Sequence, residues 1–305
     1  MNIVLVESSL DYPEVHNADV YSIYRPVNKL LRILRALHIR LGILSGFRFY
    51  WLGDWKNKLD CYEKIAIFDS LLDDYPLDIL KKNKKKIIFC YRNRIQHPIT
   101  HSKMTRNPSI LKNRYNCELW SYNKEDCDEY ALNYYSQFHL ITQEFVNHEY
   151  DIKSDAFFIG LDKGRMPLIM EIYRALLSRG MICDFRVIPR GSNYNEDEKK
   201  LLSSTITYND VLQLVKGTRC VVDVVSGMNK GLTYRSLEAA ILRKKLITNY
   251  GDITKEGYYT PDNVFVWGKD DPNKLKEFIE SEYKETEVDV YKLYSFEAFC
   301  DTIFK

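Results

Sequence analysis

Charged side chains follow three short apolar runs in the first half of the sequence. Glu7 comes after the run at 3–6, Asp69 lies near the end of the segment at 64–70, and polar residues end the segment at 86–93. Such runs are typical of parallel strands, whose carboxyl ends share one ligand-facing edge. The side chains there that could accept a proton from a hydroxyl group are Glu7, Asp69 and His97. Those that could position oxygen atoms are Arg92 and Asn93. Each could also be structural, and Asp69 could simply cap the next helix.

A loop with two glycines in the second half of the sequence predicts an anion site. RCVVDVV (219–225) is typical of a buried strand, the loop SGMNKG (226–231) follows it, and a helix is predicted over about 232–243. Glycine lets backbone N–H groups approach a ligand, and a helix N-terminus adds unpaired donors and a partial positive charge. The loop residues expected around the anion are Ser226, Gly227 and Gly231.

Two charged residues of the same helix point to a phosphate and a sugar. Arg235 in the first turn opposes the helix macrodipole, but it would pair well with a phosphate. Glu238, a turn further on, could accept hydrogen bonds from a pair of hydroxyls such as those of a ribose. The alternative is an ordinary strand–loop–helix with a solvated Arg–Glu pair.

A second basic loop follows the predicted strand AFFIG at 156–160. Lys163 and Arg165 lie in this loop, and parallel strands would bring it to the same edge as the glycine loop. An ammonium group and a guanidinium fork that converge there would suit a diphosphate. The alternative is a pair of solvated loop cations.

The candidate residues can meet only if parallel strands place their carboxyl ends at one edge of a sheet. The sequence predicts two successive α/β units that would do so. The length of 305 residues suggests two domains, and 45% apolar with 28% charged residues is usual for globular proteins. Strands and helices alternate, which favours right-handed βαβ units. We predict an α/β chain in which two Rossmann-like parallel-sheet domains face a cleft, at 1–150 and 151–289, followed by a helix at 290–305. Other predicted elements are helices at 27–45, 124–135, 167–179 and 208–216, and strands at 138–142, 183–188 and 245–249.

Several classes of protein are disfavoured by composition and motifs. A membrane-spanning protein is disfavoured because no run reaches 18 apolar residues, and a secreted protein is disfavoured because the N-terminus lacks the features of a secretory signal. Seven scattered cysteines without a C-x-x-C pair favour a reduced, cytoplasmic chain without a zinc site. A dinucleotide-dependent oxidoreductase is disfavoured because no G-x-G-x-x-G follows a predicted strand. A nucleic-acid-binding protein is disfavoured because the sequence contains no recognition-module signature. The Asp-x-Asp spacing of Asp126 and Asp128, which could hold a divalent ion, lies in a predicted helix, and the looser Glu287-x-Asp289 lies close to the C-terminus. We therefore expect no metal and no cofactor.

Positive charge is concentrated early in the chain. Residues 20–115 contain 20 Lys and Arg against 7 Asp and Glu. The helix predicted at 27–45 has an apolar stripe with basic residues off it, and FRFYWLGDW (47–55) follows. This segment could dock on an anionic membrane surface. We favour the alternative, an ordinary helix that packs on the sheet with its basic face in solvent. The stripe consists of Leu30, Ile33, Leu34, Leu37, Leu41 and Leu44.

Several motifs together resemble GT-B-fold bacterial glycosyltransferases of lipopolysaccharide core or other surface-polysaccharide biosynthesis. The motifs are IFDS (67–70), CYRN (90–93), LWSYNKEDCDEYALNYYSQF (119–138), FFIGLDKGR (157–165), GLTYRSLEAA (231–240), KKLITN (244–249) and YYTPDNVFV (258–266). They occur in the same order as in that family and cover most of the chain between about 60 and 270.

The resemblance implies a nucleotide-sugar donor in the C-terminal domain and an acceptor held by the N-terminal domain. Lys163 and Arg165 match the basic loop near the donor phosphates, Thr233 and Arg235 match the start of the helix, and Glu238 resembles the acid that binds the ribose. Lys230 stands where many retaining members carry the first of two glutamates, so neither retention nor inversion is implied. The final helix is expected to cross back to the N-terminal domain.

The predicted function is therefore a metal-independent glycosyltransferase that moves a sugar from a nucleotide-sugar donor to a growing surface glycan. Its expected partners are the donor and a glycan or lipid-linked glycan acceptor, but no nucleic acid; an anionic membrane surface stays open as an alternative partner. The expected location is the cytoplasm, including the inner face of the cell membrane. Two alternatives stay open: a GT-B-fold sugar-nucleotide epimerase, and a non-catalytic nucleotide- or sugar-binding module.

Overall fold

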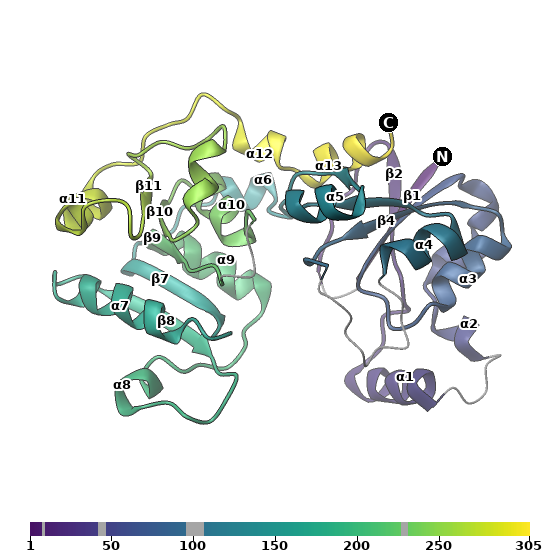
Figure 1. The fold of residues 1–305 in the computed structure, drawn as a ribbon, viewed down its shortest axis with the longest axis horizontal. Helices are drawn as coiled ribbons and strands as arrows, with labels where there is room; N and C mark the ends of the chain where they lie inside the picture. Colours follow the sequence, from purple (N-terminus) through teal and green to yellow (C-terminus); the bar gives the residue numbers. More distant parts are fainter. Residues whose placement is uncertain (8–9, 42–46, 96–106, 227–230) are drawn as a thin grey trace. The chain divides into compact units, whose positions relative to one another are not determined.

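The computed structural model describes residues 1–7, 10–41, 47–95, 107–226 and 231–305. The chain divides into an N-terminal unit of residues 1–136 and 296–305 and a C-terminal unit of residues 137–295 (Figure 1). The divisions lie after Ser136 and before Phe296, whereas the sequence prediction placed them after residues 150 and 289. Each unit is an α/β structure with its own parallel sheet, as predicted.

The sheet of the N-terminal unit has the order β2-β1-β3-β4-β5-β6, and every neighbouring pair is parallel. Both neighbours of β1 follow it in sequence, so the chain order reverses between β1 and β3. This is the topological switch point, where open α/β sheets bind ligands. The strands are β1 (Asn2–Val6), β2 (Ala18–Ser22), β3 (Lys64–Phe68), β4 (Lys86–Tyr91), β5 (Glu118–Ser121) and β6 (Asn133–Tyr134).

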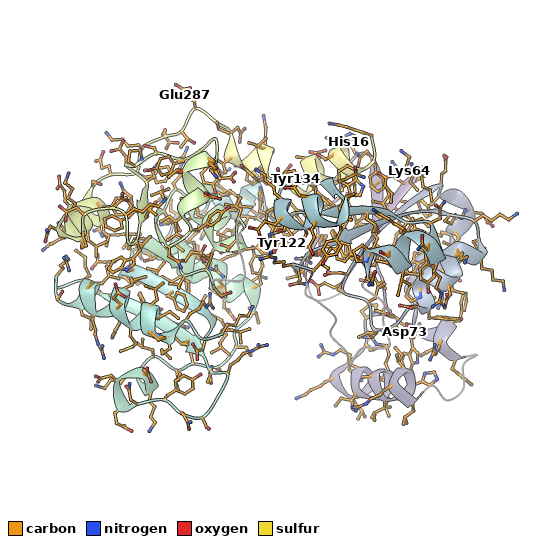
Figure 2. The ribbon with its side chains drawn as sticks, in the orientation of Figure 1. His16, Lys64, Asp73, Tyr122, Tyr134 and Glu287 are labelled. Carbon is orange, nitrogen blue, oxygen red and sulfur yellow. The ribbon has the colours of Figure 1, made fainter. Side chains whose placement is uncertain are left out.

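The helices of the N-terminal unit include one from the far end of the chain. They are α1 (Lys29–Leu41), α2 (Arg48–Trp51), α3 (Tyr75–Lys82), α4 (Pro108–Tyr115), α5 (Lys124–Tyr130) and α13 (Phe296–Ile303), with 3-10 turns at Asp54–Asn57 and Leu59–Cys61. In α13, the Phe299 ring lies 5.5 Å from the ring of Phe68 and 4.9 Å from that of Tyr135. His16, labelled in Figure 2, contacts Glu297 of the same helix at 2.6 Å. The C-terminal helix therefore completes the core of the N-terminal unit.

The sheet of the C-terminal unit has the order β11-β10-β9-β7-β8 and is also parallel throughout. It repeats the arrangement of the first sheet, with its switch point between β7 and β9. The strands are β7 (Ser154–Leu161), β8 (Cys183–Ile188), β9 (Thr218–Asp223), β10 (Lys245–Thr248) and β11 (Val264–Val266).

Five of the described helices of this unit begin at an N-cap residue whose side chain accepts a backbone hydrogen bond, namely α6, α8, α9, α10 and α12. Thr207 and Asp210 form a capping box at the start of α9, and the Thr233 hydroxyl caps α10. The helices are α6 (Gln143–Asn147), α7 (Met166–Leu177), α8 (Glu196–Lys199), α9 (Tyr208–Lys216), α10 (Tyr234–Ile241), α11 (Leu275–Glu280) and α12 (Val290–Leu293), with 3-10 turns at Gly251–Lys255 and Pro272–Lys274.

Three predicted elements differ from the structure. The strand predicted at 138–142 is wrong, because only His139 pairs there, in an isolated bridge with Ser295. The helix predicted near 124–135 ends at Tyr130, since Ala131 adopts a left-handed φ of 50° and β6 follows. The single final helix is two helices, α12 and α13, and the chain passes from one unit to the other between them.

Candidate functional site

Two loops of the C-terminal unit flank its switch point. The loop after β7 contains Asp162, Lys163 and Arg165, and the loop after β9 leads through Ser226 and Gly231 to α10. Asn249, just beyond β10, receives a hydrogen bond from the Val225 N–H at 2.7 Å and donates one to the Val225 carbonyl at 3.0 Å. Lys163 and Arg165 thus follow β7, and Ser226 and Gly231 follow β9, at the shared carboxyl edge of the two strands that the sequence predicted.

Arg165 links the carboxyl ends of the two strands at the switch point. Its guanidinium donates to the carbonyls of Leu161, Asp162 and Val224, and it lies 5.8 Å from the centre of the Phe158 ring. Burial lowers its pKa, although a guanidinium stays protonated in proteins. A methyl group on Gly160 would lie 2.8 Å from this guanidinium, so a side chain at that position would require Arg165 to move from its carbonyl partners. Arg165 therefore supplies positive charge to the switch point while its donors hold the strands.

Lys163 is the exposed cation of this loop. It has a left-handed φ of 46°, and Gly164 follows with φ of 76°, so the chain turns sharply into α7. Burial lowers the pKa of the Lys163 ammonium, and the nearby charges of Arg165 and Arg190 lower it further. Arg190, in the loop after β8, is also exposed. Two exposed cations thus lie in the loops after the neighbouring strands β7 and β8, and the first of these is the loop where the sequence predicted a diphosphate.

The loop that carries Arg190 is tied to the switch point by Tyr194. The Tyr194 hydroxyl donates to Asp162 at 2.9 Å and accepts from the Arg190 N–H at 3.0 Å. The other oxygen of Asp162 accepts from the Met166 N–H at 2.9 Å and so caps α7. One carboxylate therefore fixes both the loop after β7 and the loop after β8.

Asp223, at the end of β9, holds the first turn of α10. Its carboxylate accepts hydrogen bonds from the hydroxyls of Thr233 at 2.6 Å and Ser236 at 3.0 Å. Burial raises the pKa of the Asp223 carboxyl, while those two hydrogen bonds and the charges of Arg235 and Arg165 act in the opposite direction. The helix predicted to receive an external anion thus already has an internal carboxylate beside its N-terminus.

Arg235 and Glu238 bind each other, whereas the sequence analysis predicted separate contacts with a phosphate and a ribose. The Arg235 guanidinium donates to Glu238, whose side chain is fully buried, and Arg235 itself is only 17% exposed. Burial raises the pKa of the Glu238 carboxyl, and the charge of Arg235 partly offsets that effect. The i,i+3 spacing on one helix face brings the two groups together. In this geometry Glu238 presents no surface to a ligand.

Tyr208, the first residue of α9, completes this buried group. Its hydroxyl is buried, and burial together with the neighbouring charge of Glu238 raises the pKa of the phenol. The tyrosine, Asp223 and Ser236 were all missed by sequence reasoning. Of the three, Asp223 carried a readable signal, since it is a single acidic residue within an otherwise apolar parallel strand.

The N-terminal unit brings four predicted residues to the carboxyl edge of its sheet. Glu7 follows β1 and accepts a hydrogen bond from Arg92, which follows β4, at 2.8 Å. Arg92 also donates to the Tyr12 hydroxyl at 2.7 Å and lies 5.4 Å from the centre of the Phe68 ring. The Glu7 side chain is 35% exposed, which leaves its carboxylate accessible to a ligand.

Asp69 and Asn93 form the second contact at this edge. The Asn93 amide donates to the Asp69 carboxylate at 3.4 Å, and the Asp69 N–H donates to the Cys90 carbonyl at 3.1 Å. Asp69 is buried, whereas Glu7 is half-buried. Glu7 and Asp69 follow β1 and β3, the two strands on either side of the switch point.

Two predicted site residues, His97 and Gly227, lie outside the described residues. In the parts of the chain that the structure describes, no group of three or more His, Cys, Asp and Glu residues could hold a metal ion. Within those parts, no helix combines the length and the apolar character that a membrane-spanning segment needs.

Sequence comparison identifies no relatives. No known protein family matches the chain, and no curated protein sequence matches it.

Solved structures provide the decisive comparison. The glycosyltransferase AviGT4, involved in avilamycin A biosynthesis, matches with a TM-score of 0.50 at 8% identity, over 99% of this chain and 95% of that one. Sucrose-phosphate synthase from Thermosynechococcus elongatus matches with a TM-score of 0.50 at 10% identity, over 99% of this chain and 87% of that one. The fold is GT-B-like. The resemblance noted in the sequence motifs is thus confirmed at the level of fold.

A further match among solved structures is the lipopolysaccharide outer core galactosyltransferase WaaB in its apo form. It matches with a TM-score of 0.41 at 14% identity, over 94% of this chain and 82% of that one. In this chain the order β8-β7-β9-β10-β11 of the second sheet repeats the order β2-β1-β3-β4-β5 of the first, which has β6 in addition.

Proposed function

We propose that this protein is a cytoplasmic glycosyltransferase that moves a sugar from a nucleotide-sugar donor to a growing glycan destined for the cell surface. The observation that carries the proposal is the position of Lys163, an exposed cation in the loop after β7 at the switch point of the C-terminal sheet in a GT-B-like fold, with a second exposed cation, Arg190, in the loop after the neighbouring strand β8. Open α/β sheets bind ligands at this point. The positive charge of Lys163 there, with that of Arg165, favours a ligand with a negatively charged diphosphate.

The donor diphosphate is proposed to lie between the loop after β7 and the glycine-containing loop after β9. Lys163 would contact a phosphate oxygen directly, and Arg165 would add positive charge while it holds the strand ends. Ser226, Gly231 and the start of α10 at Thr233 would contribute polar groups from the opposite loop. These cations would stabilise the charge that develops on the departing nucleotide, so the proposed reaction needs no metal ion.

The acceptor is proposed to bind in the N-terminal unit. Glu7 and Asp69 flank the switch point of that sheet, and both are candidates to take the proton from the acceptor hydroxyl. Glu7 is the more accessible of the two, and Arg92 holds it in place. Asn93 is placed to orient Asp69 or a sugar hydroxyl.

Donor binding is tested first. Addition of UDP-, GDP-, CMP- or dTDP-sugars should raise the thermal unfolding temperature for at least one nucleotide, because only the folded state binds it. Loss of a charge-assisted hydrogen bond in Lys163→Ala should weaken that binding about tenfold to a hundredfold. Lys199→Ala, which removes an exposed lysine paired with Glu196, is the matched control and should bind normally. No stabilisation by any of these donors, or equal affinity in both variants, would reject the proposed site.

The reaction class is tested next with the donor so identified. Transfer should release free nucleotide only when a glycan acceptor is present, and it should continue in EDTA. An epimerase would instead return an isomerised sugar still attached to its nucleotide, and a binding module would leave the donor unchanged. Glu7→Gln and Asp69→Asn should keep donor affinity, and the variant that lacks the base should lose transfer.

A further inference from the structure

The apolar stripe of α1 faces solvent. Its members are between 47% and 66% exposed, although an amphipathic helix of a globular protein ordinarily buries this face. The described members are Leu30, Ile33, Leu34, Leu37 and Leu41. Leu44, the last residue of the predicted stripe, lies outside the described residues. The expectation that this helix packs on the sheet through its apolar face is therefore wrong.

The opposite, polar face of α1 attaches the helix to the protein. Arg35, the one buried residue of α1, donates to the Arg25 carbonyl at 3.0 Å, and its guanidinium lies 5.1 Å from the centre of the Tyr24 ring. His38 accepts a hydrogen bond from the Trp51 indole at 2.7 Å, which joins α1 to α2. These contacts orient the leucines outward.

Aromatic side chains extend the exposed apolar surface beyond α1. Phe47, Phe49 and Tyr50 are each more than 40% exposed. Tyr50 lies 4.9 Å from the Arg25 guanidinium, and Phe49 lies 4.9 Å from the Lys56 ammonium. Aromatic rings beside cations are typical of segments that lie at the boundary between lipid headgroups and acyl chains.

The charge around this surface selects its partner. Residues 20–53 contain six Lys and Arg and no Asp or Glu. Arg35 is buried and Arg48 lies 3.6 Å from Asp73, and the exposed cations are Arg25, Lys29, Arg32 and Arg40. Lys29 and Arg40 lie on one flank of the stripe, since successive residues of a helix are rotated by about 100°. Two copies of this surface would repel each other, because both carry the same charge. An anionic lipid surface attracts the cations and accepts the leucines.

We propose that α1 and α2 form a membrane-binding surface that lies in the headgroup region of an anionic bilayer. The stripe of α1 enters the boundary of the acyl chains, and the flanking cations contact lipid phosphates. In Figure 1 the helix lies at the lower edge of the N-terminal unit. The inference depends on exposure and charge in this unit alone, so it is independent of the proposed reaction.

The test uses the whole protein and vesicles of two compositions. We expect co-sedimentation with phosphatidylcholine vesicles that contain about one third phosphatidylglycerol, much weaker binding to pure phosphatidylcholine, and release as salt screens the charges. Leu34→Gln/Leu37→Gln should reduce binding at least about tenfold, since two side chains lose their apolar contact with lipid. Leu177→Gln/Leu293→Gln replaces two equally exposed leucines elsewhere and should bind as the unchanged protein does.

Three results would overturn the proposal: no binding to anionic vesicles, equal binding by the stripe variant, or equal loss in the control variant. Self-association of the unchanged protein that the stripe variant abolishes, without vesicle binding, would show that a second copy covers the stripe. Thermal unfolding of each variant establishes that it is folded. Nucleotide affinity, measured in parallel, should be the same in all of them.

Discussion

Replacement of Arg235 by methionine should destabilise the C-terminal unit rather than simply weaken nucleotide binding. The substitution leaves the fully buried Glu238 carboxylate without its cation. Loss of one partner of a buried ion pair costs about 3–5 kcal/mol. We expect the lower end, about 3 kcal/mol, because Arg235 is 17% exposed and water can partly replace it. For a unit of this size the unfolding temperature should fall by about 6–12 °C.

The pH dependence of this loss follows from Glu238. Burial already raises its pKa above the ordinary value of 4.5, and removal of Arg235 raises it further. Between the ordinary pKa and the raised one, Glu238 is protonated in the folded variant and ionised in the unfolded chain. The stability that this proton contributes is lost as pH rises through the folded pKa. The destabilisation should be largest at neutral pH and should shrink as pH falls towards 4.5.

The assay is urea unfolding followed by circular dichroism at several pH values. Glu238→Gln added to Arg235→Met should restore most of the lost stability, because the amide carries no charge. Arg243→Met removes an exposed Arg–Glu pair in the same unit, in which both side chains are 68% exposed, and should cost less than about 1 kcal/mol. Unchanged stability of Arg235→Met together with weaker nucleotide binding would refute this reasoning and restore Arg235 as a phosphate ligand.

Three further outcomes are expected from other contacts. Thr233→Val should lower the free energy of unfolding by about 1–2 kcal/mol in urea titrations, because it removes the cap of α10 and a bond to a buried carboxylate, whereas Thr233→Ser keeps both. Gly160→Ala should cost about 1–3 kcal/mol by the same assay, since the new methyl would displace the Arg165 guanidinium; a stability equal to that of the unchanged protein would contradict the packing described. The hydrogen bond to Glu297 raises the pKa of His16 above 6.5, so the protonated imidazole stabilises the contact between His16 and α13. As pH rises past the raised pKa this stabilisation is lost, and hydrogen exchange in α13, corrected for its intrinsic pH dependence, should become faster. His16→Asn should remove this pH-dependent change.

Much of the fold was predictable because short apolar runs and helical periodicity alternate along the chain. The bounds predicted for the strand at 183–188 and the helix at 208–216 match β8 and α9. Local sequence could not distinguish a strand from a linker at 138–142, because both bury apolar residues and only long-range pairing separates them. The periodicity of α1 likewise identified its apolar stripe correctly, but it cannot tell which side of a helix meets the protein.

The candidate sites were predictable in position but not in pairing. Strand ends place Glu7, Asp69 and Lys163 at their sheet edges from the sequence alone. The sequence also puts Arg235 and Glu238 on one face of a helix, where each could meet either a ligand or the other. Burial decides between these outcomes, and burial depends on α9 and on the rest of the sheet rather than on the local segment.

The position of α13 has a consequence for how the protein is made. Phe296 and Phe299 are buried in the N-terminal unit, where Phe296 packs against Tyr12 with ring centres 5.1 Å apart. A ribosome synthesises the whole C-terminal unit before these residues emerge, so the N-terminal unit lacks the α13 part of its core while the C-terminal unit folds. In nascent chains stalled before residue 296, the N-terminal unit should therefore be sensitive to protease, whereas the C-terminal unit should already be protected from it.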